Sequence, residues 1–213
     1  MSADRQVGEQ ERDSFELPLF PLRSVLFPGG LLGLKVFEVR YLDLIGACLR
    51  SATGFGVVAL RQGSEVRVGE EPVDLETIGV AAEILDVDSP QSGILNVRCR
   101  GSRRFATSAV RQQDDGLWIA QAQWLPDDEP AAVDDKLQAS AKALVSAVDA
   151  LHAQGARPFL EPLQFDDAGW VANRWCELLP IPLAAKQKLM ALDDPLIRLG
   201  LVDEFLRKKG VVS

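Results

Sequence analysis

Apolar and polar residues alternate along the first part of the chain, which is the pattern of β-strands with one buried face. Leu32, Leu34 and Val36, for example, are separated by a glycine and a lysine. Strand patterns cover residues 15–19, 32–36, 55–61, 77–87, 94–100, 103–111 and 117–125. Short turn signals separate these segments, and Gly101-Ser102 predicts a two-residue hairpin turn between two of them. This half of the chain is therefore predicted to be mainly β.

One helix interrupts the predicted strands. Tyr41, Leu44, Ile45, Cys48 and Leu49 are spaced at i, i+3, i+4, i+7 and i+8 and form one apolar stripe from about residue 38 to 51. No further helix alternates with the strands. This order favours an antiparallel sheet or a small barrel over repeated βαβ units.

The pattern changes at the acidic and proline-containing segment 126–130, after which each periodic segment is helical. An apolar stripe runs from Val133 to Leu151 and ends at Gly155, a residue suited to helix termination. Asp166 is predicted to cap the next helix, and Asp194 with Pro195 is predicted to begin the last one. The predicted helices cover residues 133–151, 166–179, 182–192 and 194–210.

These patterns predict an α+β fold. An antiparallel, barrel-type β subdomain with one inserted helix is expected over residues 14–126, and an α-helical subdomain is expected over 131–210. Residues 1–13 contain almost no large apolar side chain, so they are predicted to form a flexible lead-in.

Composition narrows the class of protein. The chain has 213 residues, 47% of them apolar, and a net charge of −8, which indicates a packed core and disfavours long-range attraction to nucleic acid. Three cysteines, an odd number, are typical of a reducing compartment. No apolar run reaches the roughly 18–20 residues of a membrane span. We therefore expect a soluble cytoplasmic protein without a membrane partner.

Catalytic and cofactor motifs fail in context. Gly54-Phe55-Gly56-Val57-Val58-Ala59 matches a dinucleotide fingerprint by letter, but it follows a predicted helix and leads into a strand, which is the reverse of the required order. No lysine precedes a serine or threonine as in a phosphate loop, and His152 is the only histidine. We therefore expect no catalytic, cofactor-binding or metal-binding residue. A hydrolase would need a pocket that brings a serine or carboxylate to a base such as His152.

Arginines cluster between residues 98 and 111. Arg98, Arg100, Arg103, Arg104 and Arg111 could form a local patch for an anion or RNA. The alternative interpretation, which the net charge favours, is that they are exposed strand positions paired with nearby acids.

Four ordered blocks carry a resemblance to a known family. The opening Leu-Pro-Leu-Phe-Pro-Leu-Arg-Ser-Val-Leu-Phe-Pro-Gly-Gly of residues 17–30, with the following strand 32–38, resembles the amino-terminal substrate-recognition domain of Lon proteases. The strand from Thr77, the segment from Val97 to Phe105 and the helical stretch 178–199 are similar to later blocks of that family. The resemblance covers about residues 15–207.

This resemblance implies a PUA-like β barrel and a helical subdomain that engage unfolded or tagged protein segments. It implies no chemistry in the domain itself. In full-length proteases of the family an ATPase and a Ser–Lys peptidase follow on the same chain, whereas this sequence ends at Ser213. We therefore predict a stand-alone, non-catalytic binding module, an adaptor or accessory factor in protein quality control that works with a separate ATPase or protease.

The sequence supplies two sets of binding candidates. Phe27, Phe159, Trp170 and Trp175 are candidate peptide contacts, with core packing as the simpler interpretation of each. An apolar groove at the junction of the β and α parts is the expected position of such a contact. The alternative function is an RNA-binding PUA-like protein that uses Arg98, Arg100, Arg103 and Arg104.

Overall fold

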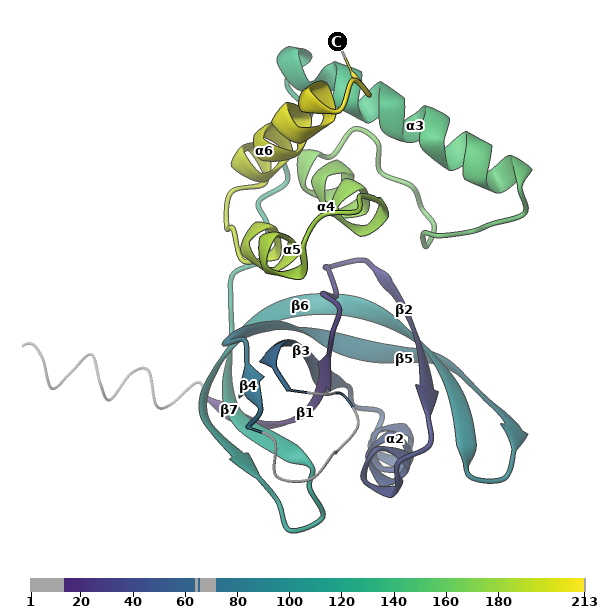
Figure 1. Cartoon of the computed structure of the whole chain (residues 1–213), viewed down its shortest axis with the longest axis vertical. Coiled ribbons are helices and arrows are strands. Elements are labelled where there is room, and N and C mark those ends of the chain that lie inside the picture. The colour runs from purple at the N-terminus through teal and green to yellow at the C-terminus, as the bar shows by residue number, and fades with distance from the viewer. Residues whose placement is uncertain (1–13, 64, 66–71, 213) are drawn as a thin grey trace, which may run out of the picture. The chain divides into compact units, whose positions relative to one another are not determined.

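A computed structural model describes residues 14–63, 65 and 72–212, so the predicted lead-in 1–13 lies outside the described residues. The chain divides into two compact units. The first unit contains the residues up to Leu26 and Leu32–Leu125, and the second contains Phe27–Leu31 and Pro126–Ser213. Each unit is described below by itself (Figure 1).

The first unit contains a seven-stranded sheet and one helix among the residues that the structure describes. The helix α2 (Val39–Ser51) carries the predicted apolar stripe and buries four of its members. The strands are β1 (Phe15–Leu22), β2 (Leu31–Val36), β3 (Phe55–Gln62), β4 (Asp74–Leu75), β5 (Ile78–Gln91), β6 (Ile94–Gln112) and β7 (Trp118–Trp124).

The sheet closes into a barrel because β1 has two strand neighbours. Its order is β1-β7-β6-β5-β3-β4, and β1 also pairs with β3. The pairings along this ring are antiparallel except that of β1 with β3, which is parallel and aligns Leu19 with Gly56. The predicted barrel-type β subdomain is therefore present, with one parallel seam that alternation alone did not predict.

Buried side chains fill the barrel. Leu17, Leu19, Val58 and Phe105 belong to its hydrophobic core. Gly56 is required beside them, because a Cβ there would lie 2.7 Å from the Phe105 ring and 2.8 Å from a Leu17 methyl carbon. The Gly54–Ala59 sequence thus follows helix α2 and runs into strand β3, the order that excludes a dinucleotide-binding turn.

The predicted hairpin turn at Gly101-Ser102 is wrong. Strand β6 runs unbroken from Ile94 to Gln112, and the turn that joins it to β5 lies at Ser92-Gly93, where Gly93 has a φ of +77°. Gly101 is buried opposite Ala82, beside a shift in the β5–β6 register. A glycine inside a strand often marks such an irregularity. Glycine is also common in turns, so the residue type alone does not distinguish the two cases.

The second unit contains helices from Asp135 onward. They are the 3₁₀ turn η1 (Asp135–Leu137), α3 (Gln138–Ala153), α4 (Ala168–Leu178), α5 (Leu183–Met190) and α6 (Pro195–Lys208). Asp194 caps α6 as predicted, accepting hydrogen bonds from the amides of Leu196 and Ile197. The cap of α4 is Asp167, which accepts from the Trp170 amide, and not the predicted Asp166. Within the described residues, no helix is both long and apolar enough to cross a membrane.

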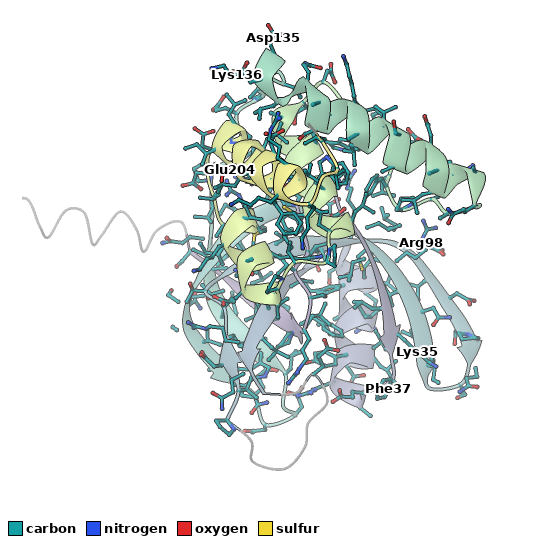
Figure 2. All side chains as sticks on the ribbon, turned by 45° about the horizontal axis from the view of Figure 1, so that its top comes forward. Lys35, Phe37, Arg98, Asp135, Lys136 and Glu204 are labelled. Atoms are coloured by element: carbon teal, nitrogen blue, oxygen red, sulfur yellow. The ribbon has the colours of Figure 1, made fainter. Side chains whose placement is uncertain are left out.

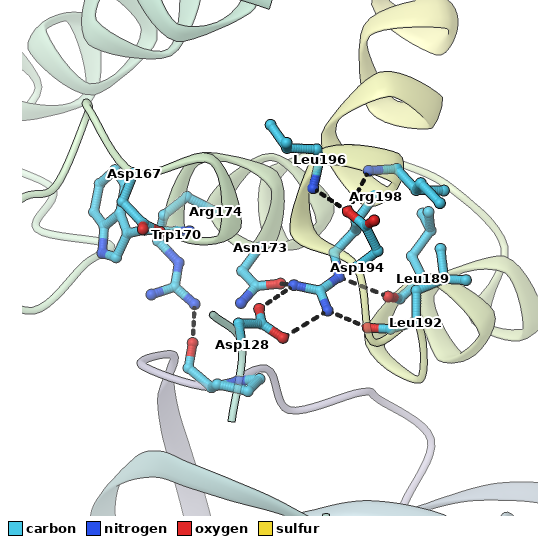
Figure 3. Close-up of polar contacts among 12 residues, drawn as sticks. Asp128, Asp167, Trp170, Asn173, Arg174, Leu189, Leu192, Asp194, Leu196 and Arg198 are labelled. Atoms are coloured by element: carbon cyan, nitrogen blue, oxygen red, sulfur yellow. Dashed lines mark hydrogen bonds and ion pairs between the residues drawn. The ribbon is translucent and has the colours of Figure 1, made fainter. Parts of the chain in front are cut away.

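Phe27–Leu31 belongs to the helical unit, although the sequence placed it within the β subdomain of residues 14–126. The Arg174 guanidinium of α4 donates a hydrogen bond of 3.0 Å to the carbonyl oxygen of Pro28 (Figure 3). Gly29 lies so close to this arginine that a Cβ would be 3.1 Å from its Nη1. This contact joins segments 146 residues apart, which no local sequence pattern indicates.

Candidate functional site

The β unit contains a groove of about 770 Å³ at the start of β1. Strand β1 and strand β5 line it together with the carboxyl end of α2 and the loop that follows this helix. The lining residues are Phe15–Pro18, Cys48, Leu49, Ala52–Gly54, Ala81–Ile84, Ser102 and Trp124. All of them belong to the first unit.

The groove exists because β3 begins late relative to its neighbours. The pairing of β1 with β3 starts at Leu19 and Gly56, whereas the pairing of β1 with β7 already includes Phe15. Before β3, the chain leaves the sheet at Ala52, which has a φ of +52° and whose amide bonds to the carbonyl of Cys48 as the helix cap. The described residues therefore give Phe15–Pro18 a strand partner on the β7 side alone.

The rim of the groove carries charge that is already paired. Glu16 forms an ion pair of 2.7 Å with Arg111, and Glu83 forms one of 2.5 Å with Arg100. All four side chains are about half exposed, so each pair contributes at most about 1 kcal/mol to stability. Inside the rim, aliphatic and aromatic side chains dominate the lining. The groove is therefore suited to a largely apolar ligand.

Cys48 does not offer a nucleophile in this groove. Its thiol contacts the carbonyl oxygen of Gly54 at 3.5 Å. Burial raises the pKa of Cys48, which keeps the thiol protonated and unreactive at neutral pH. The other two cysteines, Cys99 and Cys176, are also buried, and burial raises the pKa of each to about 12. The described residues contain no group of three or more His, Cys, Asp or Glu positioned to hold a metal ion.

The arginines predicted as an anion patch do not share one environment. Arg104 is only 2% exposed, so its guanidinium does not face solvent. Arg103 lies over the Trp124 ring at 5.2 Å, and Arg100 pairs with Glu83. Arg98 is exposed on β6 (Figure 2). Strand geometry thus directs these side chains to different partners, and the RNA-binding alternative stays a prediction.

The aromatic candidates all lie in the helical unit. Phe27, Phe159 and Trp175 are buried, and the Trp175 indole donates to the carbonyl of Ser140 at 2.9 Å. Trp170 is partly exposed and meets Phe159 edge-on with ring centroids 5.8 Å apart. The buried three pack as core residues, so a peptide contact through their side chains would require the unit to open. Sequence reasoning could not separate these two roles, since both favour aromatic residues.

Arg174 forms the centre of this aromatic cluster. Its guanidinium carbon lies 5.5 Å from the Phe159 ring centroid and 5.7 Å from that of Trp170. It also donates to Glu177 at 2.8 Å. Burial raises the pKa of Glu177 to about 7, although Arg174 and Lys186 act in the opposite direction. The cluster holds residues 27–31 in the helical unit, so its role is structural.

Sequence reasoning missed the residues that line the groove, with one partial signal. Leu49 ends the predicted apolar stripe of α2, yet it is 53% exposed and lines the groove. An apolar residue at the end of a stripe can mark a surface that the fold leaves open. Glu16 and Trp124 gave no such signal, because their place in the groove depends on which strands pair.

Comparison with known proteins gives a consistent family assignment. A family model described as the ATP-dependent protease La (LON) substrate-binding domain matches residues 16–208. A protein from Parabacteroides distasonis named Lon protease is 29% identical over 188 residues, and one from Anaeromyxobacter dehalogenans with the same name is 27% identical over 199 residues. The matches cover 84% and 91% of this chain but only 22% and 23% of those relatives. The chain thus spans less than a quarter of their length.

The solved structures that resemble this chain are also N-terminal domains of Lon proteins. The crystal structure of a Lon N-terminal domain protein from Xanthomonas campestris is 32% identical, with a TM-score of 0.69, and the match covers 88% of this chain and 96% of that one. The N-terminal domain of a Lon protease from the Mycobacterium avium complex has a TM-score of 0.60 at 16% identity, covering 89% and 97% of the two chains, and this match concerns the fold alone.

Proposed function

The chain belongs to the family of ATP-dependent protease La (LON) substrate-binding domains, and from this premise we propose that it captures unfolded or tagged protein segments. The observation that carries the proposal is the extent of the family match, which runs from residue 16 to residue 208 and so includes both units. The likeness to substrate-binding domains therefore extends over both units and is not limited to a short motif.

The groove of the β unit supports this role. Its lining is mainly apolar, and its two acidic rim residues, Glu16 and Glu83, are each paired with an arginine. Unfolded proteins expose apolar segments that folded proteins bury. A groove of this chemistry discriminates between the two states because only the unfolded state presents such a segment.

The proposal extends to the fate of the bound segment. We infer that the chain acts as an adaptor or accessory factor and that its partner is an ATP-dependent protease. The names of its relatives and of its family support this part. In this role the chain supplies binding, and the partner supplies unfolding and peptide-bond cleavage.

The test compares two states of one probe protein. Fluorescein-labelled α-lactalbumin is prepared in its native form and in its reduced, carbamidomethylated form, which stays unfolded and whose cysteine caps carry no charge. Fluorescence anisotropy is then measured as the chain is titrated into each. We expect saturable binding to the unfolded form and at least about tenfold weaker binding to the native form, a difference of about 1.4 kcal/mol. Equal affinity for both forms, or binding to neither, would contradict the proposal.

A further inference from the structure

We propose that the groove holds its ligand as an added β-strand, with the backbone of an extended peptide bonded to the open edge of β1 at Phe15–Pro18. This inference rests on the proposed function, because it specifies how the same binding module holds a polypeptide. The ligand is a segment of another protein in extended conformation. It has apolar side chains at alternate positions and no acidic residue within the bound stretch.

The open edge follows from the registers of β1. On one side, Phe15, Glu16, Leu17 and Pro18 pair with β7. On the other side the pairing with β3 begins only at Leu19, so this stretch of backbone faces the groove without a strand partner among the described residues. Backbone amides and carbonyls are strong hydrogen-bonding groups, and an exposed strand edge is a template for another strand.

Strand β5 borders the same space from the other side. Its pairing with β3 ends at Ala82, opposite Phe55, while Glu83 and Ile84 continue beyond the start of β3 and line the groove. Gly54 lies directly against this strand, since a Cβ there would be 2.4 Å from the carbonyl oxygen of Ala82. The loop before β3 thus stays close to β5 and leaves the free edge on β1.

The lining determines which side chains the added strand carries. Side chains of a strand alternate between its two faces, so every second residue of the ligand points into the groove. The surfaces that it meets there include Leu49, Ile84 and Trp124. Apolar side chains at these alternate positions gain most from burial. Peptide recognition of this kind takes affinity from the backbone and specificity from alternate side chains.

The charge of the groove also determines which extended segments can bind. The charged residues among the lining are Glu16 and Glu83, both acidic. Their partners Arg111 and Arg100 are not among the lining residues, so an acidic side chain on the ligand would meet these carboxylates first and be repelled. A lysine or arginine could share the carboxylates with those partners. The net charge of −8 acts in the same direction. The ligand is therefore a neutral or basic segment.

The experiment changes the backbone of the probe and not its side chains. The probe is a fluorescein-labelled peptide in which valine and threonine alternate between terminal lysines. Two control peptides carry N-methyl groups on either all valines or all threonines, which removes the amide donors from one edge of the strand at a time. We expect one methylated peptide to lose at least about tenfold in affinity, because several backbone hydrogen bonds are lost, and the other to bind within about twofold of the parent.

A pair of variants tests whether the peptide binds in this groove. Leu49→Arg places a charge in the groove lining, whereas Val39→Arg places one on the same helix, at a 73% exposed residue that does not line the groove. We expect at least about tenfold weaker peptide binding for the first and an unchanged affinity for the second. Hydrogen exchange gives an independent readout on the unmodified chain, because strand addition slows exchange at the amides of Glu16 or Leu17.

The outcomes separate this inference from the proposed function. Strand addition is overturned if the parent and both methylated peptides bind with equal affinity. It is also overturned if Leu49→Arg and Val39→Arg bind the parent peptide alike and the peptide does not slow hydrogen exchange at residues 16–17. In that case binding to carbamidomethylated α-lactalbumin can persist, and the proposed function stands with another site. If the wild-type chain binds neither the peptide nor the unfolded protein, both proposals fail together.

Discussion

Two fully buried arginines carry much of the polar organisation of the helical unit. Arg198, with 1% of its side chain exposed, donates to both carboxylate oxygens of Asp128 at 2.5 and 3.1 Å. It also donates to Asn173 and to the carbonyl oxygens of Leu189 and Leu192 (Figure 3). A buried guanidinium is tolerated when its donors are satisfied in this way. Removing it takes the two guanidinium hydrogen bonds away from the Asp128 carboxylate.

Arg198→Ala is therefore expected to lower the free energy of unfolding by about 3–5 kcal/mol. The measurement is urea unfolding followed by tryptophan fluorescence. Arg98→Ala is the matched control, since Arg98 is exposed on β6, and we expect a change within about 0.5 kcal/mol. Comparable losses in the two variants would show that the Arg198 contacts contribute little net stability.

Glu177 makes the stability of the chain depend on pH in an unusual direction. Burial raises its pKa from 4.5 to about 7, so between these values the folded state binds a proton that the unfolded state releases. The contribution of this carboxyl to stability is thus present at low pH and is lost as the pH rises through 7. Glu177→Gln should flatten this part of the profile of unfolding free energy against pH.

The control for this prediction is Glu204→Gln, because Glu204 is exposed on α6 (Figure 2). It should leave the profile between pH 4.5 and 7 as it is in the wild type. A wild-type stability that rises over this range, with the same slope in Glu177→Gln, would rule out the proposed role of the Glu177 carboxyl.

Among the elements, the barrel depends on close approach between β3, β5 and β6. At Gly79 of β5, a Cβ would lie 2.3 Å from the carbonyl oxygen of Val57 and 2.6 Å from the Phe105 ring. A backbone oxygen held in a sheet cannot move away as a flexible side chain can. This position therefore excludes even the smallest side chain.

We expect Gly79→Ala to destabilise the chain by about 1–3 kcal/mol through overpacking. Gly33→Ala in β2 is the control, because a Cβ there meets no atom within 4 Å, and it should change stability by less than about 0.5 kcal/mol. Urea unfolding of both variants provides the measurement. An unaffected Gly79→Ala variant would indicate that the barrel wall adjusts at this point.

The same elements show how far the sequence could predict the fold. Periodicity indicates the strands, α2 and the later helices, because alternation and helical stripes are local properties. The cap of α4 is one residue from its predicted position, since Asp166 and Asp167 are both suitable cap residues and only geometry selects between them. The parallel β1–β3 seam and the groove beside it depend on which strands meet, and this is not encoded in any local pattern.

For the whole molecule, charge distinguishes the two candidate functions. The net charge is −8, and two of the arginines between 98 and 111 are paired with acids at the groove rim. Binding that relies on an apolar groove and backbone hydrogen bonds releases few counterions. Nucleic-acid binding would instead depend steeply on salt.

We therefore expect the affinity for carbamidomethylated α-lactalbumin to change by less than about threefold between roughly 50 and 300 mM NaCl. A labelled single-stranded RNA should bind more weakly than this protein at every salt concentration. The RNA-binding alternative would be supported by tight RNA binding that falls steeply with salt and with Arg98→Ala. Anisotropy titrations of both probes across the salt series distinguish these results.

Segment 27–31 also has a consequence for the order in which the protein can be built. The contact between Arg174 and Pro28 spans 146 residues, so during synthesis this segment leaves the ribosome long before its partner helix exists. The helical unit can reach its final form only when nearly the whole chain has emerged. For the same reason, a fragment that begins at Pro126 lacks a part of its own core, and any transplant of this unit into another protein must carry the Phe27–Leu31 segment with it.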